Sequence, residues 1–211
     1  DIFIREAERR GLIEPITAWT LDAACRQIRA LPDVAPRNFR IGVNLSATQL
    51  GRGAAEMVAG VLKSTGADPA RLTLEVTETA PFIDDAAAVR DVVRIKALGC
   101  GVAIDDFGAG HASLAYVAKL PADRIKLDAS LIRAAVFDAR ARAAVAATVR
   151  LAHDVGADVV AEGVATAGDA ATVEALGVRL AQGGLIGPPR DAPFDPGGER
   201  PLSLDRPDGA A

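Results

Sequence analysis

The chain has 211 residues, of which 50% are hydrophobic, and its formal net charge at pH 7 is −4. This length and apolar fraction exclude general disorder and are typical of one domain with a substantial core. The slight acidity argues against duplex DNA or RNA as a partner. We expect no membrane segment, because no apolar run approaches the roughly 18 residues of a span.

The two cysteines, Cys25 and Cys100, are far apart in the sequence. We expect both to be small core residues in a reducing compartment rather than a disulfide. The sequence therefore predicts a cytoplasmic domain. This prediction also covers a domain that forms the cytoplasmic portion of a larger, membrane-associated protein. Because the chain begins with Asp1 and not methionine, we expect a longer parent protein.

Helices are predicted from caps and apolar stripes, in chain order. Residues 3–10 form a short helix that ends at Gly11, and a longer helix with Pro15 in its first turn ends at Pro32. Trp19 lies on this second helix and is predicted to be a core aromatic. The later predicted helices lie within residues 57–66, 84–99, 114–121, 138–156 and 169–177.

Six short apolar runs lie between these helices, and each leads into a residue that can hold a metal or a phosphate. Parallel strands of a barrel are covered on both faces and read as apolar runs, and barrel enzymes build their sites at the strand ends. The runs at 39–43, 72–74, 101–104, 124–125, 159–161 and 178–181 lead into Asn44, Glu75 with Glu78, Asp105 with Asp106, Lys126 with Asp128, Glu162, and Gln182.

This pattern predicts an α/β fold of the TIM-like (β/α) barrel type, incomplete in this chain, with about six parallel strands and the helices outside. The alternative is an open doubly wound sheet. That fold concentrates its ligand at one switch point, whereas the candidate residues here follow all six runs.

The candidate ligands form an all-oxygen set, which suits Mg²⁺ or Mn²⁺ and argues against zinc. The adjacent Asp105 and Asp106 are expected to point in different directions and so to serve two neighbouring ions. Lys126 suits a phosphate or a water between the metals. Two-metal sites of this kind cleave phosphodiesters. The alternative is a set of capping acids paired with Lys126 and holding no ion.

At these residues the chain resembles the family of cyclic di-GMP phosphodiesterases named for a Glu-Ala-Leu motif, the EAL domain. The resemblance covers residues 1–189, and residues 190–211 read as a flexible tail rich in proline and glycine. The motifs stand in the family's order: Val43-Asn44-Leu45-Ser46, Leu74-Glu75-Val76-Thr77-Glu78, Ile104-Asp105-Asp106-Phe107-Gly108, Ile125-Lys126-Leu127-Asp128, Ala161-Glu162-Gly163-Val164 and Gln182-Gly183.

The resemblance implies hydrolysis of cyclic di-GMP to linear pGpG with two Mg²⁺ or Mn²⁺ ions. It implies that Asn44, Glu75 and Asp105 bind one ion, and that Asp106 with the region of Lys126 serves the other. Glu162 would be the base or a metal ligand, and Lys126 would orient water or phosphate. The remaining implied roles are substrate binding by Gln182 and Asp128, and anchoring by Glu78 of the loop that begins at Asp106.

That loop is linked in the family to dimerisation, so the resemblance also implies a homodimer. It further implies sensor or GGDEF-type domains in a longer parent protein. Five positions depart from the family's pattern. Ala165 replaces a frequent second glutamate, Ala109 and His111 stand in place of threonine and tyrosine, and Gly187-Pro188 stands in place of a serine-arginine pair.

The family's first two strands, with the naming motif and its metal-binding glutamate, would precede Asp1. We therefore expect the isolated chain to be weak or inactive. Glu174-Ala175-Leu176 matches the motif in letters only, and Glu174 is expected at the surface. Two alternatives stay open. One is a degenerate domain that binds cyclic di-GMP as an effector or contacts a protein. The other is a barrel enzyme for another phosphorylated small molecule.

Overall fold

The computed structural model describes residues 2–31, 35–36, 38–77, 84–109 and 114–187. Glu78, His111 and the tail at 190–211 lie outside the described residues, so the expectations about them stay predictions. The chain forms two compact units. The first holds Asp1–Asp105 with Ser113–Asp123, and the second holds Asp106–Ala112 with Arg124–Ala211.

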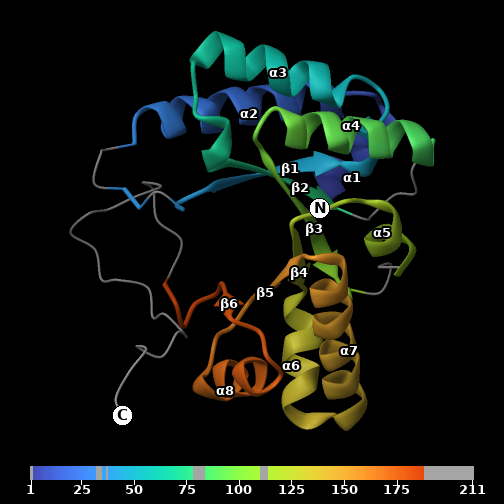
Figure 1. Cartoon of the computed structure of the whole chain (residues 1–211), viewed down its shortest axis with the longest axis vertical. Helices are drawn as coiled ribbons and strands as arrows, with labels where there is room; N and C mark the ends of the chain where they lie inside the picture. The colour runs from blue at the N-terminus through green and yellow to red at the C-terminus, as the bar shows by residue number, and fades with distance from the viewer. Residues whose placement is uncertain (1, 32–34, 37, 78–83, 110–113, 188–211) are drawn as a thin grey trace. The chain divides into compact units, whose positions relative to one another are not determined.

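In the first unit, helices cover one face of the strands. Its elements are α1 (Ile2–Arg9), α2 (Ile13–Arg29), β1 (Ile41–Ser46), the 3₁₀ helix η1 (Ala47–Gln49), α3 (Ala54–Thr65), η2 (Pro69–Arg71), β2 (Leu72–Thr77), α4 (Asp85–Ala97), β3 (Gly101–Phe107, which continues into the second unit) and α5 (Leu114–Lys119). Figure 1 shows α2, α3 and α4 lying over β1 and β2. The side chains of Val43, Leu45, Leu74 and Val76 are buried in these strands.

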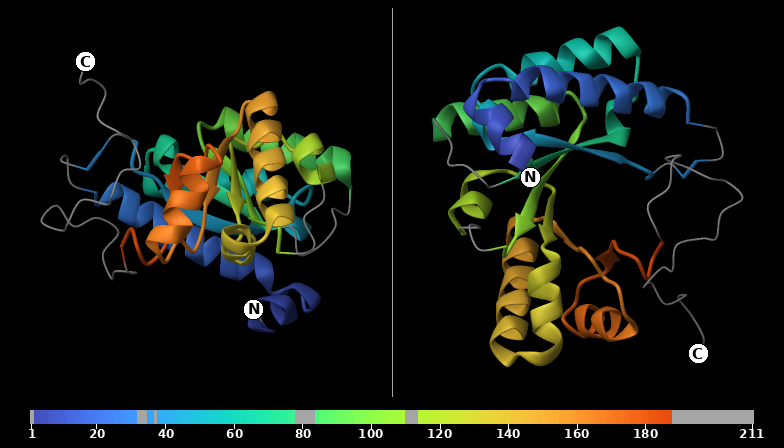
Figure 2. Two further views of the ribbon diagram at one scale, coloured as in Figure 1. Left: turned by 90° about the horizontal axis from the view of Figure 1, so that it is seen from below. Right: turned by 180° about the vertical axis from the view of Figure 1, so that it is seen from behind.

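The second unit holds the three remaining strands and a pair of long helices. Its elements are β4 (Arg124–Leu127), α6 (Ala129–Phe137), α7 (Ala139–Val155), β5 (Asp158–Ala161), α8 (Ala167–Ala175) and β6 (Leu180–Ala181). In both side views α6 and α7 run next to one another (Figures 1 and 2). Asp138 joins them, and its carboxylate accepts the Arg140 amide at 2.9 Å to cap α7.

The strands follow one another in the order β1-β2-β3-β4-β5-β6. β1 pairs in parallel with β2 and β2 with β3, as β4 does with β5 and β5 with β6. A strictly sequential order has no switch point, so it is the order of a TIM-like (β/α) barrel and not of a doubly wound sheet. The predicted class, about six parallel strands with helices around them, is confirmed.

Two details of the helix predictions are wrong. Trp19 is 73% exposed, because α2 turns its stripe of Thr17, Leu21 and Ile28 to the core and Trp19 lies two positions off that stripe. The helix α6 was not predicted, because Asp128 was taken only as a ligand. In the structure Asp128 caps α6, accepting the Ser130 amide at 2.8 Å.

Both cysteines are free and buried, as predicted. Burial raises the pKa of the Cys100 thiol to about 12, and burial likewise raises the pKa of Cys25. Thiols with raised pKa values are poor nucleophiles at neutral pH, which fits two core residues. Within the described ranges, no helix combines the length and the apolarity needed to cross a membrane.

A capping box starts α8 and fixes the loop that follows β5. The Thr166 hydroxyl accepts the Asp169 amide at 3.1 Å, and Asp169 Oδ2 accepts the amides of Thr166 (2.9 Å) and Ala165 (3.0 Å). Burial alone raises the pKa of Asp169, but these hydrogen bonds to its carboxylate hold the pKa below its ordinary value. The carboxylate therefore stabilises the fold above its unfolded-state pKa of about 3.9, and this contribution is lost as pH falls through the lower folded pKa.

We predict that Asp169→Ala lowers the free energy of unfolding by about 1–2 kcal/mol at pH 7, because two amides lose their acceptor. The matched control is Glu174→Ala in the same helix, which should change it by less than about 0.5 kcal/mol. Urea unfolding at pH 7 and at acidic pH measures both. A loss for Asp169→Ala that does not shrink towards acidic pH would contradict the assignment.

Candidate functional site

An ion pair between a buried and a partly buried side chain lies at the end of β4 and β5 in the second unit. The Glu162 amide donates to the Leu127 carbonyl at 3.0 Å, which extends the strand pairing by one residue and places Glu162 directly after β5. Lys126 Nζ lies 2.8 Å from Glu162 Oε1, and the two side chains are only 9% and 19% exposed. Removing one partner would leave a charge with little access to water, so each side chain holds the other in place.

The backbone of β3 turns sharply at Asp106. Its φ is +56°, and among the described residues it is the one non-glycine with a positive φ. Aspartate tolerates this left-handed conformation at a cost of about 1–2 kcal/mol. Side chains alternate along a regular strand, and the turn breaks that alternation. The side chain of Asp106 can therefore lie on the same side of the strand as the side chain of Asp105.

Three carboxylates meet at this turn. Asp106 and Glu162 of the second unit, and Asp105 through its peptide bond to Asp106, each offer an oxygen, and these oxygens lie within 4.8 Å of one another. The expectation that Asp105 and Asp106 point apart is therefore wrong, and the left-handed backbone at Asp106 is the reason.

The separation fits a hard divalent cation. Oxygen ligands on opposite sides of Mg²⁺ lie about 4.1 Å apart, and around Ca²⁺ about 5 Å apart. In the part of the chain that the structure describes, the group contains carboxylates and no histidine or cysteine. Crowded carboxylates are costly without a compensating positive charge, and an all-oxygen set prefers Mg²⁺, Mn²⁺ or Ca²⁺ to zinc.

The other predicted ligands lie in the first unit, on neighbouring strands. Asn44 of β1 stands opposite Glu75 of β2, and Glu75 stands opposite Ala103 of β3. Asp105 is two residues beyond Ala103, so it lies on the same face of β3 as Ala103. One part of the predicted placement is wrong, since these residues were expected directly after their strands. Asn44, Glu75 and Asp105 lie inside their strands, each two residues before the strand ends.

A glycine makes room for the Glu75 side chain. A Cβ added at Gly42 would lie 2.4 Å from Glu75 Oε1, so the carboxylate leans over the position where any other residue would have a side chain. The prediction from sequence missed Gly42. A signal was present, because a glycine inside a strand often marks a close approach.

Gln182 follows β6 and is held by its main chain. Its amide donates to the Ala161 carbonyl at 2.8 Å, and its carbonyl accepts the Val164 amide at 3.0 Å. Gly183 allows this approach, because a Cβ there would lie 2.3 Å from the Val164 carbonyl oxygen. The main chain of Gln182 is thus hydrogen-bonded to Ala161 and Val164, which lie on either side of Glu162 in the sequence. The Gln182 side chain is exposed.

Asp128 has a structural task that the sequence did not suggest. Its Oδ1 accepts both the amide and the hydroxyl of Ser130 at the start of α6. A substrate-binding role for Asp128 stays a prediction. Ala109, Ala165 and Gly187, where the chain departs from the family's pattern, are all exposed. Glu174, the glutamate of the Glu-Ala-Leu that matches the family's motif in letters only, is exposed on α8, as predicted.

Comparison with known proteins decides the family. The family model described as "EAL domain" matches residues 1–189. The chain belongs to the EAL domain family. The predicted membership is confirmed, and the solved structures that resemble this EAL domain support the TIM-like fold. One of them, a phosphodiesterase structure of PaMucR in complex with c-di-GMP, has a TM-score of 0.79 and 38% identity, covering 89% of this chain and 76% of that one.

Two curated relatives come from Pseudomonas aeruginosa. The bifunctional diguanylate cyclase/cyclic di-GMP phosphodiesterase MucR is 38% identical over 191 residues, which are 90% of this EAL domain chain and 28% of MucR. The cyclic di-GMP phosphodiesterase NbdA is 35% identical over 190 residues, 90% of this chain and 24% of NbdA. The chain thus spans less than two thirds of the length of these relatives.

A third similarity concerns metals. A manganese/cy-diGMP complex of Klebsiella pneumoniae BlrP1 has a TM-score of 0.70 and 30% identity, covering 80% of this chain and 43% of that one. Another structure of BlrP1 is a calcium/cy-diGMP complex. BlrP1 is thus seen with manganese and with calcium, and the carboxylate group of this EAL domain has the oxygen ligands that such ions prefer.

We predict that Gly183→Ala destabilises the chain by at least about 2 kcal/mol, because the new Cβ would collide with the main chain of Val164. The neighbouring Gly184→Ala is the control. A Cβ there meets nothing within 4 Å, so its effect should stay below about 1 kcal/mol. Urea unfolding measures both variants, and equal effects would contradict the role given to Gly183.

Proposed function

We propose that this chain carries a cyclic di-GMP-specific phosphodiesterase domain that hydrolyses cyclic di-GMP to linear pGpG. The observation that supports it best is the carboxylate group of Asp105, Asp106 and Glu162, with Lys126 2.8 Å from Glu162. The names of MucR and NbdA point to the same reaction class. The proposed domain spans residues 1–189, with residues 190–211 as a tail.

The proposed cofactors are two Mg²⁺ or Mn²⁺ ions. Asn44, Glu75 and Asp105 would hold one ion, and Asp106 would hold the other with the help of the region around Lys126. When bound, such ions polarise the phosphoryl oxygens and lower the pKa of water, which is the chemistry that phosphodiester cleavage needs.

The chain's own groups have distinct proposed tasks. Glu162 accepts the proton of the attacking water or serves as a metal ligand, and its pairing with Lys126 keeps it oriented. Lys126 directs its charge to a phosphate oxygen or to the water. Gln182 and Asp128 contact the substrate, Asp128 through the carboxylate oxygen that does not cap α6. The oxygen of the attacking water forms a new P–O bond while the P–O bond to the ribose oxygen breaks, and the departing ribose oxygen takes up a proton from solvent.

We further propose that the isolated chain has weak turnover or none. The sequence contains one Glu-Ala-Leu, and its glutamate, Glu174, is exposed near the end of α8. Glu174 therefore does not replace the metal-binding glutamate of the family's naming motif. Binding of cyclic di-GMP needs phosphate contacts but not a complete metal set, so it can persist where hydrolysis is slow.

The exposed position of Glu174, away from the proposed metal ligands in the sequence, favours a second candidate function. A domain that binds cyclic di-GMP without cleaving it would act as an effector or as a protein-interaction module. The proposed assembly is the same in either case. It is a cytoplasmic domain in a longer protein with sensor or GGDEF-type domains, forming a homodimer through the loop after Asp106 that Glu78 anchors.

We predict that Glu162→Gln lowers pGpG formation by about 100-fold or more, the size typical of removing a general base. Asp106→Asn should also lower it, because the substitution removes a charged ligand of a proposed ion. The assay incubates the chain with Mn²⁺ and cyclic di-GMP and quantifies pGpG by chromatography. Glu174→Gln is the matched control and should keep the full rate. Where the unsubstituted chain forms measurable pGpG, an equal rate in the Glu162→Gln chain would refute the role of Glu162.

Metal removal gives a separate test. EDTA should abolish pGpG formation, and added Mn²⁺ should restore it, because the chemistry depends on the carboxylate-bound ions. Calorimetric titration with cyclic di-GMP measures binding alongside. Binding with no product in Mn²⁺ would favour the effector, and neither binding nor product would exclude both candidate functions for this chain.

A further inference from the structure

One side chain of α6 packs directly on the turn that follows Asp106. Gly108 has a φ of +98°, and a Cβ added there would lie 2.6 Å from Leu131 Cδ2 and 3.3 Å from Leu131 Cβ. The Leu131 side chain thus fills the space that a side chain at position 108 would need. The Asp128 amide, just before α6, donates to the Phe107 carbonyl at 3.0 Å. The start of α6 therefore holds this turn through a side chain and through a main-chain hydrogen bond.

The same end of α6 also holds the turn that carries Glu162. Gly163 follows Glu162 directly with a φ of +63°, and a Cβ added there would lie 2.3 Å from Ala129 Cβ. The Glu162 amide donates to the carbonyl of Leu127, two residues before the helix begins. Asp106, Glu162 and α6 all belong to the second unit. The first turn of α6 therefore fixes the position of Leu131 relative to Glu162.

Asp106 needs support of this kind, because its backbone adopts a conformation that is unfavourable for a residue with a side chain. Its φ is +56°, and residues in such regions keep their conformation only where the surrounding structure over-determines it. Without the Leu131 side chain on Gly108, the main chain at Asp106 can relax towards an ordinary negative φ. The Asp106 carboxylate would then move away from that of Glu162.

We propose that Leu131 is a positioning residue for Asp106, and that its contact with Gly108 sets the affinity of the carboxylate group for a divalent cation. The inference rests on the proposed function, because it requires that the carboxylates bind an ion. Ligands that already stand in place bind more tightly, since less ordering is left to the binding step. Residues that orient metal ligands without touching the ion commonly change metal affinity by about 10–100-fold.

The test measures Mn²⁺ binding in the absence of cyclic di-GMP, through the loss of the electron paramagnetic resonance signal of free Mn²⁺. Leu131→Ala removes most of the side chain that lies on Gly108 and should weaken Mn²⁺ binding by about 10-fold or more. Leu131→Met keeps a side chain of similar volume there and should bind Mn²⁺ as the unsubstituted chain does. Urea unfolding of each variant establishes that it is folded in the conditions of the titration.

Ile132→Ala is the matched control in the same helix. Ile132 is fully buried, whereas Leu131 is partly exposed, and the two side chains leave the helix about 100° apart. Ile132→Ala should therefore lower the urea midpoint more than Leu131→Ala does, but leave the Mn²⁺ affinity unchanged. A role of Leu131 in stability alone predicts that Ile132→Ala has the larger effect in both measurements.

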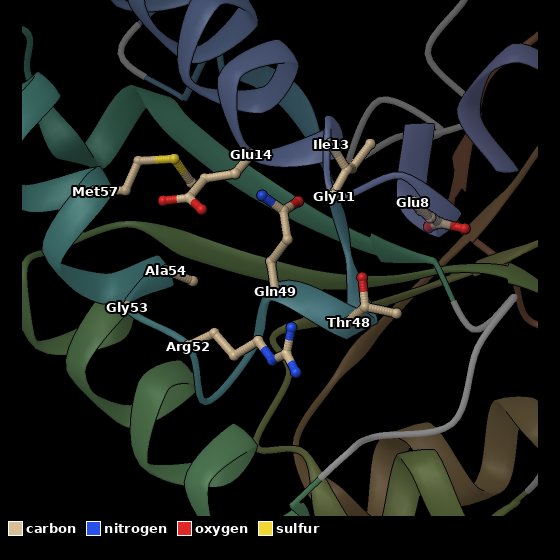
Figure 3. Close-up of a pocket in the computed structure, with 10 residues that line it drawn as sticks. All are labelled: Glu8, Gly11, Ile13, Glu14, Thr48, Gln49, Arg52, Gly53, Ala54 and Met57. Atoms are coloured by element: carbon tan, nitrogen blue, oxygen red, sulfur yellow. The ribbon is translucent and has the colours of Figure 1, made fainter. Parts of the chain in front are cut away.

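A second control addresses Mn²⁺ bound by carboxylates that have no contact with α6. Glu8 and Glu14 line a cavity of about 270 Å³ in the first unit, formed by α1, the start of α2, η1 and the start of α3 (Figure 3). Glu8 accepts the Ser46 hydroxyl at 2.6 Å, and Glu14 is exposed. Glu14→Gln should leave the Mn²⁺ affinity unchanged, whereas Glu162→Gln, which removes the same charge, should lower it.

The outcomes separate this inference from the proposed function. Equal Mn²⁺ affinities of Leu131→Ala and the unsubstituted chain would overturn the positioning role and leave the metal site in place. Equal losses of affinity in Leu131→Ala and Ile132→Ala would also overturn it, because stability alone would then explain both. An unsubstituted chain that binds no Mn²⁺, or whose binding Glu162→Gln does not weaken, would overturn the proposed metal site and this inference with it.

Discussion

Repulsion between carboxylates is the constraint around which the candidate site is built. Asp105, Asp106 and Glu162 place oxygens within 4.8 Å of one another, and such crowding needs positive charge close by. Lys126 supplies part of it through its contact with Glu162. Divalent cations would supply the rest, which is why the group is better explained by metal binding than by helix capping.

The fold meets this constraint through main-chain geometry. The left-handed φ of Asp106 brings two consecutive carboxylates together, and the hydrogen bond from the Glu162 amide to Leu127 carries strand pairing one residue further. The loop after Glu162 is then held by the capping box of α8 and by the close approach of Gly183 to Val164. Main-chain geometry thus places Asp106 and Glu162, and the contact with Lys126 then orients the Glu162 carboxylate.

Much of this arrangement was predictable from the sequence. The helices predicted within residues 84–99 and 138–156 begin after the capping residues Asp84 and Asp138. Those predicted to end by residues 66 and 156 end there, at Gly66 and Gly156 with positive φ. The apolar runs also predicted neighbouring parallel strands, which bring Asn44 opposite Glu75. These features are local, or they follow from sequential strand order, so residue type and spacing carry enough information.

The features that were missed depend on tertiary context. Nothing in Asp105-Asp106 as a sequence reveals that the backbone turns between them, since aspartate adopts a positive φ only occasionally. Asp128 can be a ligand or a helix cap, and only the position of Ser130 settles that it caps α6. Trp19 is exposed although it lies on an amphipathic helix, because its large apolar side chain lies off the buried stripe.

Anomalous diffraction from crystals of the chain grown with Mn²⁺ tests the central claim most directly, because it locates the ions without relying on turnover. The account predicts a manganese peak within coordination distance of the Asp105, Asp106 and Glu162 carboxylates. Well-ordered carboxylates with no manganese peak among them, in crystals that hold Mn²⁺, would contradict it.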